Sequence, residues 1–135
     1  MLLLACVLAG CAAQRVRDKA QDQMAEGQFE AAVAALEKGL VQHPAHPVLR
    51  AGLVQARSEA LTRLLTEAAA ARAAGRLDDA ERALRRAVPF DSGNRRVETL
   101  LQDLLVERRQ AEALAEANQL VEQKKSGQAL RLIAN

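Results

Sequence analysis

Two segments of this 135-residue chain share one pattern: Ala25-Glu-Gly-Gln-Phe-Glu-Ala-Ala-Val-Ala-Ala-Leu-Glu-Lys-Gly-Leu40 and Ala73-Ala-Gly-Arg-Leu-Asp-Asp-Ala-Glu-Arg-Ala-Leu-Arg-Arg-Ala-Val88. In each, a glycine is followed two residues later by a large apolar residue. Small and aliphatic residues then recur at i, i+4 and i+7, which is one face of a helix (Ala32, Leu36 and Gly39; Ala80, Leu84 and Ala87). Gly27 and Gly75 can take φ > 0 without a steric penalty, as a turn between helices requires. The pattern therefore predicts helix, glycine turn, helix, repeated and stacked.

The composition favours an all-helical domain. Half of the residues are hydrophobic and 27% are charged, but only 1% are aromatic. Alanine, leucine, glutamate, glutamine and arginine dominate, and these are strong helix formers. No segment alternates apolar and polar residues, so we expect no sheet. The formal charge of +2 is too small to indicate nucleic-acid binding, and the chain has no Tyr or Trp on which bases could stack.

Proline and glycine positions predict the helix boundaries. We expect a first hairpin over about 13–43, a second over about 48–89 and an incomplete third over about 95–135. The segment 43–47, with Pro44 and Pro47, ends the second helix in a turn, and Pro89 ends a later one. The polar turn 91–94 supplies capping residues, and Gly127 is expected to open the third turn. The two long helices should bury one face each, made of Leu49, Leu53, Ala56, Ala60, Leu64, Ala68 and Ala71 in the first, and of Val97, Leu100, Leu101, Leu104, Ala111, Leu114 and Val121 in the second.

The first residues look like a secretory leader. An apolar run of about ten residues is too short to span a bilayer. It ends in Leu8-Ala9-Gly10-Cys11, which resembles the lipobox of bacterial lipoproteins, although no Lys or Arg precedes the run. The resemblance implies a signal peptide over 1–10 and lipidation of Cys11, with Ala12 favouring the outer membrane and a periplasm-facing domain. A buried N-terminal helix with an incidental cysteine is the alternative.

The repeated segments resemble the tetratricopeptide repeat (TPR), a helical hairpin of about 34 residues. The residues that carry the resemblance are Ala20, Gly27, Phe29, Ala32, Leu36, Leu40 and Pro44, then Ala68, Gly75, Leu77, Ala80, Leu84 and Ala87. The turn glycines 27, 75 and 127 are 48 and 52 residues apart, so the first helices are unusually long. The resemblance implies an all-α, TPR-like solenoid of antiparallel hairpins over 11–135.

A lipobox followed by such stretched repeats also resembles the N-terminal region of outer-membrane secretins, the ring channels of type II secretion and type IV pilus-related systems. That resemblance implies a non-enzymatic scaffold that binds secretion or pilus components, and a homo-oligomer if it belongs to a ring. The break inside the third hairpin would then mark a fragment of a longer protein. A free-standing TPR-type lipoprotein adaptor in outer-membrane or pilus assembly is the alternative.

Stacked hairpins are expected to bind a peptide or helix on the concave face lined by the first helix of each unit. On that face we expect Gln23, Arg63, Glu67 and Ala71. A second candidate surface is a basic cluster that could contact anionic lipid or an acidic partner, made of Arg82, Arg85, Arg86, Arg95 and Arg96.

Other chemistry has weaker support in the sequence. His43 and His46 have a spacing that metal sites use, but prolines surround them and no third ligand is near in sequence, so we expect turn residues and no metal or cofactor. The carboxylates are Asp78, Asp79, Glu107, Glu112 and Glu116. They fit solvated helix faces that pair with Arg82, Arg108 and Arg109, and the sequence predicts no enzyme.

Overall fold

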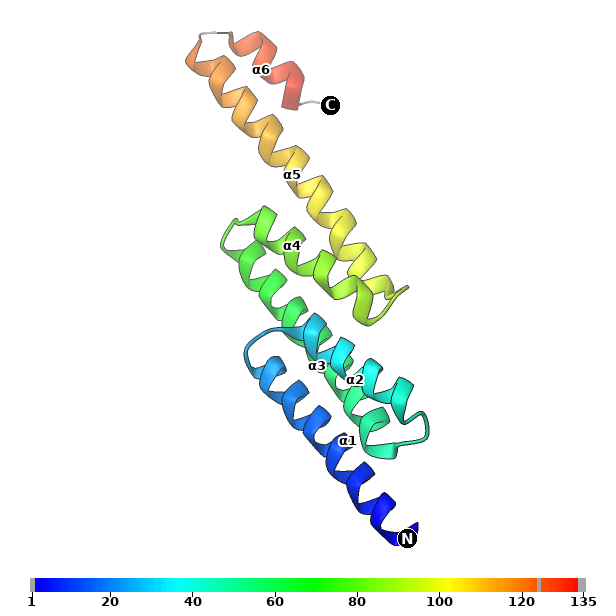
Figure 1. Cartoon of the computed structure of the whole chain (residues 1–135). Coiled ribbons are helices and arrows are strands. Elements are labelled where there is room, and N and C mark those ends of the chain that lie inside the picture. The colour runs from blue at the N-terminus through cyan, green and yellow to red at the C-terminus, as the bar shows by residue number, and fades with distance from the viewer. Residues whose placement is uncertain (1, 124, 134–135) are drawn as a thin grey trace. The chain divides into compact units, whose positions relative to one another are not determined.

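The computed structural model describes residues 2–123 and 125–133, apart from the side chains of 2–12, 129, 132 and 133. This part of the chain is all-helical and contains no strand, which confirms the prediction of an all-α protein (Figure 1). Its α-helices are α1 (Leu2–Ala25), α2 (Phe29–Gln42), α3 (Pro47–Ala73), α4 (Leu77–Ala87), α5 (Arg95–Glu122) and α6 (Ser126–Ile133), with a short 3-10 helix η1 (Val88–Phe90) after α4.

The chain divides into two compact units, which are described separately. Unit 1 comprises residues 1–66 and 89–92, and unit 2 comprises 67–88 and 93–135. Helix α3 contributes its first part, up to Thr66, to unit 1 and its last turns to unit 2.

The turn between α1 and α2 and the turn between α3 and α4 are closed by the same type of backbone hydrogen bond, from residue i to residue i−5. The Gln28 N–H donates to the Gln23 carbonyl and the Arg76 N–H to the Ala71 carbonyl, at 2.8 and 2.9 Å. Gly27 and Gly75 precede these donors with φ of 75° and 71°, as predicted for glycine at a helix C-terminus. This geometry satisfies carbonyls that the helix leaves unpaired.

The third turn differs from the prediction. The Lys125 N–H donates to the Leu120 carbonyl at 2.8 Å, so α5 closes with the same type of bond. Helix α6 begins at Ser126, and Gly127 therefore lies inside it instead of opening the turn. The prediction was wrong at Gly127 because the reversal is complete before the chain reaches it.

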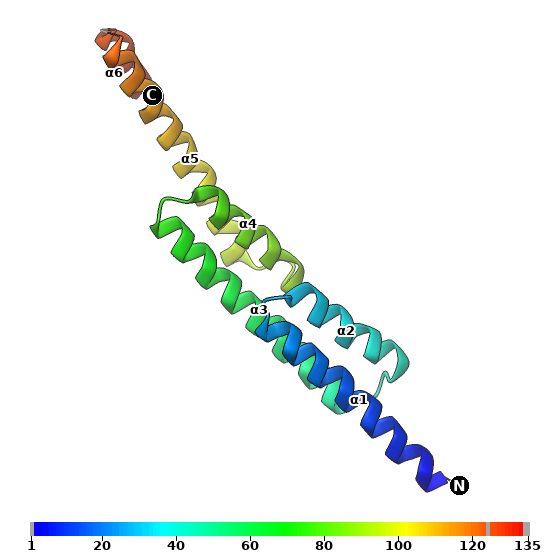
Figure 2. The same ribbon diagram turned by 60° about the vertical axis from the view of Figure 1, so that its left-hand side comes forward.

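In unit 1, helices α1, α2 and the first part of α3 lie side by side in both views (Figures 1 and 2). The predicted repeat positions form the centre: Ala32 and Leu36 are at most 1% exposed. A Cβ on Gly39 would lie 3.1 Å from Val16 Cγ1 and 3.2 Å from Leu49 Cδ1, so this glycine lets all three helices meet. The apolar core is completed by Ala20, Met24, Phe29, Val33, Ala56, Ala60, Leu64 and Phe90.

In unit 2, the second copy of the repeat is buried as predicted: Ala80, Leu84 and Ala87 are at most 2% exposed. Helix α5 begins at an asparagine cap, because Asn94 Oδ1 accepts hydrogen bonds from the Arg96 and Val97 N–H groups at 3.0 and 3.3 Å. The capping function predicted for the polar turn 91–94 is thus confirmed.

The predicted inner face of α5 is correct only near its start. Val97 and Leu104 are buried, whereas Ala111 is exposed and Leu114 and Val121 are each 54% exposed. Helix α4 has 11 residues and α5 has 28, so α4 covers only part of α5. Further along α5 the buried residue is Ala117, and α6 is the helix that packs against α5 after the end of α4. The buried stripe therefore changes face along the helix.

Helix α1 is longer than the sequence predicted. It begins at Leu2, and its backbone runs through Cys11 without a break. Residues 2–10 are mostly leucine and alanine, which propagate a helix. The side chain of Cys11 lies outside the described residues. Among the described residues, no helix is both long enough and apolar enough to cross a bilayer.

Candidate interaction groove

A groove of about 190 Å³ lies within unit 1 and is lined by α1, α3 and one residue of α2. Its lining residues recur at intervals of three and four on α1 and on α3, so each helix presents one face to it. They are Arg17, Ala20, Gln21, Met24 and Ala25 of α1, Leu36 of α2, and Gly52, Gln55, Ala56, Glu59 and Arg63 of α3. We call this set the α1/α3 groove.

The floor of the α1/α3 groove is apolar. Ala20, Met24, Leu36 and Ala56 are each at most 5% exposed, so their side chains belong to the core and show the groove only small apolar surfaces. An apolar ligand side chain that covers this floor would remove its own surface and the remaining surface of the floor from water. Such burial favours binding by roughly 25 cal/mol per Å² of apolar surface.

The rim of the groove is polar. The Arg63 guanidinium donates to Glu59 Oε1 at 2.7 Å, one helical turn earlier, and both side chains are well exposed. Such a pair contributes about 0.3–0.5 kcal/mol to helix stability. By contrast, Arg17 is half-buried and has no ion-pair partner among the residues that the structure describes. The Arg17 guanidinium is therefore available to a ligand.

Two glutamines line the groove, Gln21 from α1 and Gln55 from α3. Both are exposed, and neither has a hydrogen-bond partner in the described part of the chain. An amide side chain offers two donors and an acceptor. These groups match the N–H and C=O groups of a peptide main chain.

Of the residues predicted to bind a partner, only Arg63 lines the groove. Gln23 is on α1 but outside the lining set, and its Oε1 is buried without a partner. Glu67 is exposed beyond the groove. The prediction was wrong at Ala71, because this residue is 3% exposed and its side chain packs in the core of unit 2.

The face of α3 that the sequence predicted to bind a partner is nevertheless the face that lines the groove, at a different height along the helix. Arg63 and Glu67 continue the stripe that contains Gln55 and Glu59, so the groove occupies the same stripe two turns earlier. The sequence did not identify Arg17, Gln21, Gln55 or Glu59. The signal that could have found them is a glycine at position 52 inside a long helix, where a glycine is otherwise unfavourable.

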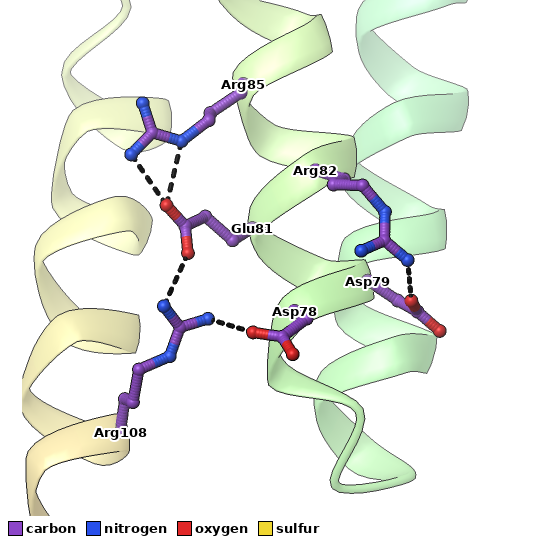
Figure 3. A network of polar contacts seen from close by, with 6 residues as sticks. All are labelled: Asp78, Asp79, Glu81, Arg82, Arg85 and Arg108. Carbon is purple, nitrogen blue, oxygen red and sulfur yellow. Dashed lines mark hydrogen bonds and ion pairs between the residues drawn. The ribbon is translucent and has the colours of Figure 1, made fainter.

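The predicted basic cluster is partly neutralised within unit 2. Arg82 pairs with Asp79, and Arg85 donates to Glu81 Oε1 at 2.6 Å (Figure 3). Arg86 is half-buried and has an interaction of its own, whereas Arg95 and Arg96 are exposed at the start of α5. Binding of anionic partners by this cluster stays a prediction.

The carboxylates of α4 hold α4 to α5. Arg108 of α5 donates to Asp78 Oδ1 at 2.5 Å and contacts Glu81 Oε2 at 2.9 Å, on the other side of α4 from the Asp79–Arg82 pair (Figure 3). The hydrogen bond from Arg85 lowers the pKa of Glu81; burial opposes the shift, and the positive charges of Arg85 and Arg108 add to it. These ion pairs agree with the predicted partners of Asp78 and Asp79.

Glu107 and the pair His43 and His46 were the remaining candidates for chemistry, and each has a contact that fits a structural role. Glu107 accepts from Arg72 Nε at 2.7 Å, within unit 2, and not from the neighbouring arginines that the sequence suggested. His43 and His46 make an edge contact, with ring centroids 6.5 Å apart, in the turn between α2 and α3. In the part of the chain that the structure describes, no three His, Cys, Asp or Glu side chains are grouped as metal ligands.

Comparison with known proteins adds no relative: no protein-family model, no curated protein and no solved structure matches this chain.

Proposed function

We propose that this chain is a non-enzymatic protein–protein interaction module and that the α1/α3 groove is its binding surface. The observation that carries the proposal is the composition of the groove: an apolar floor, two unpartnered glutamine amides and an unpartnered arginine. Peptide recognition uses this combination, because apolar contact supplies binding free energy and fixed polar groups orient the main chain.

The TPR-like solenoid is part of this proposal. Its support is the repeated turn geometry at Gly27 and Gly75, together with a groove lined mainly by α1 and α3, the first helices of successive hairpins. Stacked hairpins of this kind create extended surfaces on which several turns of two helices contribute side chains.

The proposed location is the periplasmic face of the bacterial outer membrane, with lipid on Cys11. Its support is the sequence Leu8-Ala9-Gly10-Cys11 after an apolar run. The proposed partners are components of a secretion or pilus machinery, with the chain as the N-terminal part of a secretin and a homo-oligomer within its ring. A free-standing lipoprotein adaptor is the second candidate. An open reading frame that continues beyond Asn135 into β-rich ring domains would favour the secretin.

Site-specific crosslinking in cells tests the proposed function. A photoreactive amino acid replaces Gln55 in the groove, and the control places it at Ala69, which is exposed on α3 outside the groove. We expect one discrete crosslinked envelope protein from position 55 and none from position 69. Equal crosslinking from both positions, or none from position 55, would contradict the proposal.

A further inference from the structure

Gly39 and Gly52 both lie inside helices of unit 1, and their surroundings differ. At Gly39 of α2, a Cβ would be 3.1 Å from Val16 Cγ1 and 3.2 Å from Leu49 Cδ1, so close helix packing requires the missing side chain. At Gly52 of α3, the nearest atom to such a Cβ is Leu36 Cδ2 at 3.4 Å, an ordinary van der Waals contact. Helix packing therefore does not require glycine at position 52, although glycine weakens a helix relative to alanine.

The position of Gly52 supplies a different reason for the glycine. Gly52 is half-buried and lines the α1/α3 groove beside Leu36 and Ala56. Because position 52 carries no side chain, this part of the groove stays open next to Leu36 Cδ2, and we call it the notch. A leucine or isoleucine side chain from a ligand would fill this notch and contact the floor. A larger residue at position 52 would fill it from within.

The charges of the groove indicate a second feature of the ligand. Glu59 is already paired with Arg63 at 2.7 Å, whereas Arg17 has no carboxylate partner among the described residues. The groove thus presents one uncompensated positive charge. A guanidinium in a half-buried position binds a carboxylate through charge-assisted hydrogen bonds, which are stronger than neutral ones.

We propose that the groove binds a short acidic peptide segment, with one aliphatic side chain in the notch above Gly52 and one carboxylate on Arg17. The amides of Gln21 and Gln55 bond its main chain. This inference rests on the proposed function and adds the chemistry of the ligand. It makes Gly52 and Arg17 the residues that determine specificity.

Selection from a phage-displayed library of random short peptides, on the purified chain, tests the inference. Selected peptides should combine an aliphatic residue with Asp or Glu. Their dissociation constants are then measured by fluorescence anisotropy. Gly52→Leu should abolish binding, and Gly52→Ala should weaken it while raising the melting temperature, because alanine stabilises the helix. Ala69→Leu, which adds the same leucine to α3 outside the groove, should bind normally.

The role of the Arg17 charge is tested by comparing Arg17→Gln with a control substitution at Lys19. Arg17→Gln should weaken binding about ten- to a hundredfold, as expected for loss of a charged hydrogen bond. Lys19→Gln removes an equal charge from an exposed position of α1 outside the groove and should leave the dissociation constant unchanged. Equal effects of the two substitutions would overturn the role of Arg17.

The remaining outcomes separate the inference from the function on which it rests. If peptides bind Gly52→Leu normally but lose affinity for Gln55→Trp, the groove binds peptides and the notch is wrongly assigned. If Gln55→Trp also leaves binding unchanged, or if the selection yields no peptide, both the inference and the proposed function are overturned. Gln55 is exposed, so the tryptophan can be accommodated without disturbing the core.

Discussion

Gly39 of α2 and Leu49 of α3 pack so closely that a Cβ on the glycine would lie 3.2 Å from Leu49 Cδ1. Leu49 is fully buried, so neighbouring side chains surround it on all sides. We expect Gly39→Val to destabilise the chain by about 1–3 kcal/mol through overpacking. Chemical denaturation measures this loss. The control is Gly52→Val, at a glycine with more space around it; an equal loss from both variants would contradict the packing described for unit 1.

Leu84 is the central leucine of the second repeat and is 2% exposed. Leu84→Asp buries an unpaired carboxylate, and we expect it to cost at least about 3 kcal/mol and to unfold the hairpin around α4. Leu114→Asp is the matched control, because Leu114 is 54% exposed on α5. Thermal unfolding followed by circular dichroism should shift for the first variant only. An unchanged melting temperature for Leu84→Asp would show that this leucine is not in the core.

The Glu81–Arg108 contact predicts a pH-dependent contribution to stability. The pKa of Glu81 is lowered from its ordinary value of 4.5, chiefly by the hydrogen bond from Arg85. The pKa of Glu81 is lower in the folded than in the unfolded state. The stabilisation by the ionised Glu81 is therefore fully present at a pH above the unfolded-state pKa. This stabilisation is lost as the pH falls through the folded-state pKa of Glu81. A double-mutant cycle of Glu81→Gln and Arg108→Gln should give a coupling of about 0.5–1 kcal/mol at neutral pH.

In the acid range that coupling should approach zero, since Glu81 is then protonated in both states. Arg109→Gln offers a control charge on the same helix, exposed and without an ion pair in the described residues. A coupling that persists unchanged at low pH would show that the contact does not depend on the Glu81 charge.

Lipidation makes a prediction that separates the two cysteines. Cys11→Ala should release the protein from membranes without changing its helical circular dichroism, because the proposed anchor is covalent lipid on this thiol and not the helical fold. Cys6→Ala should leave membrane association intact, since Cys6 lies in the predicted signal peptide. Fractionation of cells expressing each variant measures both. Membrane association of Cys11→Ala equal to that of the natural chain would remove the lipoprotein assignment.

The sequence predicted those parts of the fold that local chemistry controls. Pro89 ends α4, Asn94 caps α5, and the glycines at 27 and 75 take positive φ at the turns. The buried face of α3 was also predicted, because a single helical stripe of Leu and Ala leaves little choice of which side is packed.

The errors occur where neighbouring helices decide the outcome. Leu114 and Val121 are exposed because the short α4 does not reach them, and helix lengths had to be known in space to see this. The groove was placed too far along α3 for a related reason. Its position depends on which turns of α1 lie opposite α3, and a single sequence does not contain that register. Arg17 and Gln55 become partners in one site only once both helices are placed.

Crosslinking across the groove tests most directly whether α1 and α3 lie side by side with Gln21 and Gln55 on facing rims. In a chain whose natural cysteines are replaced by alanine, the pair Gln21→Cys and Gln55→Cys should react with a short bifunctional maleimide to give an internally linked monomer. The pair Lys19→Cys and Gln55→Cys should not, because Lys19 lies outside the groove. Equal linkage of both pairs, or no linkage of the first, would contradict the groove and the function built on it.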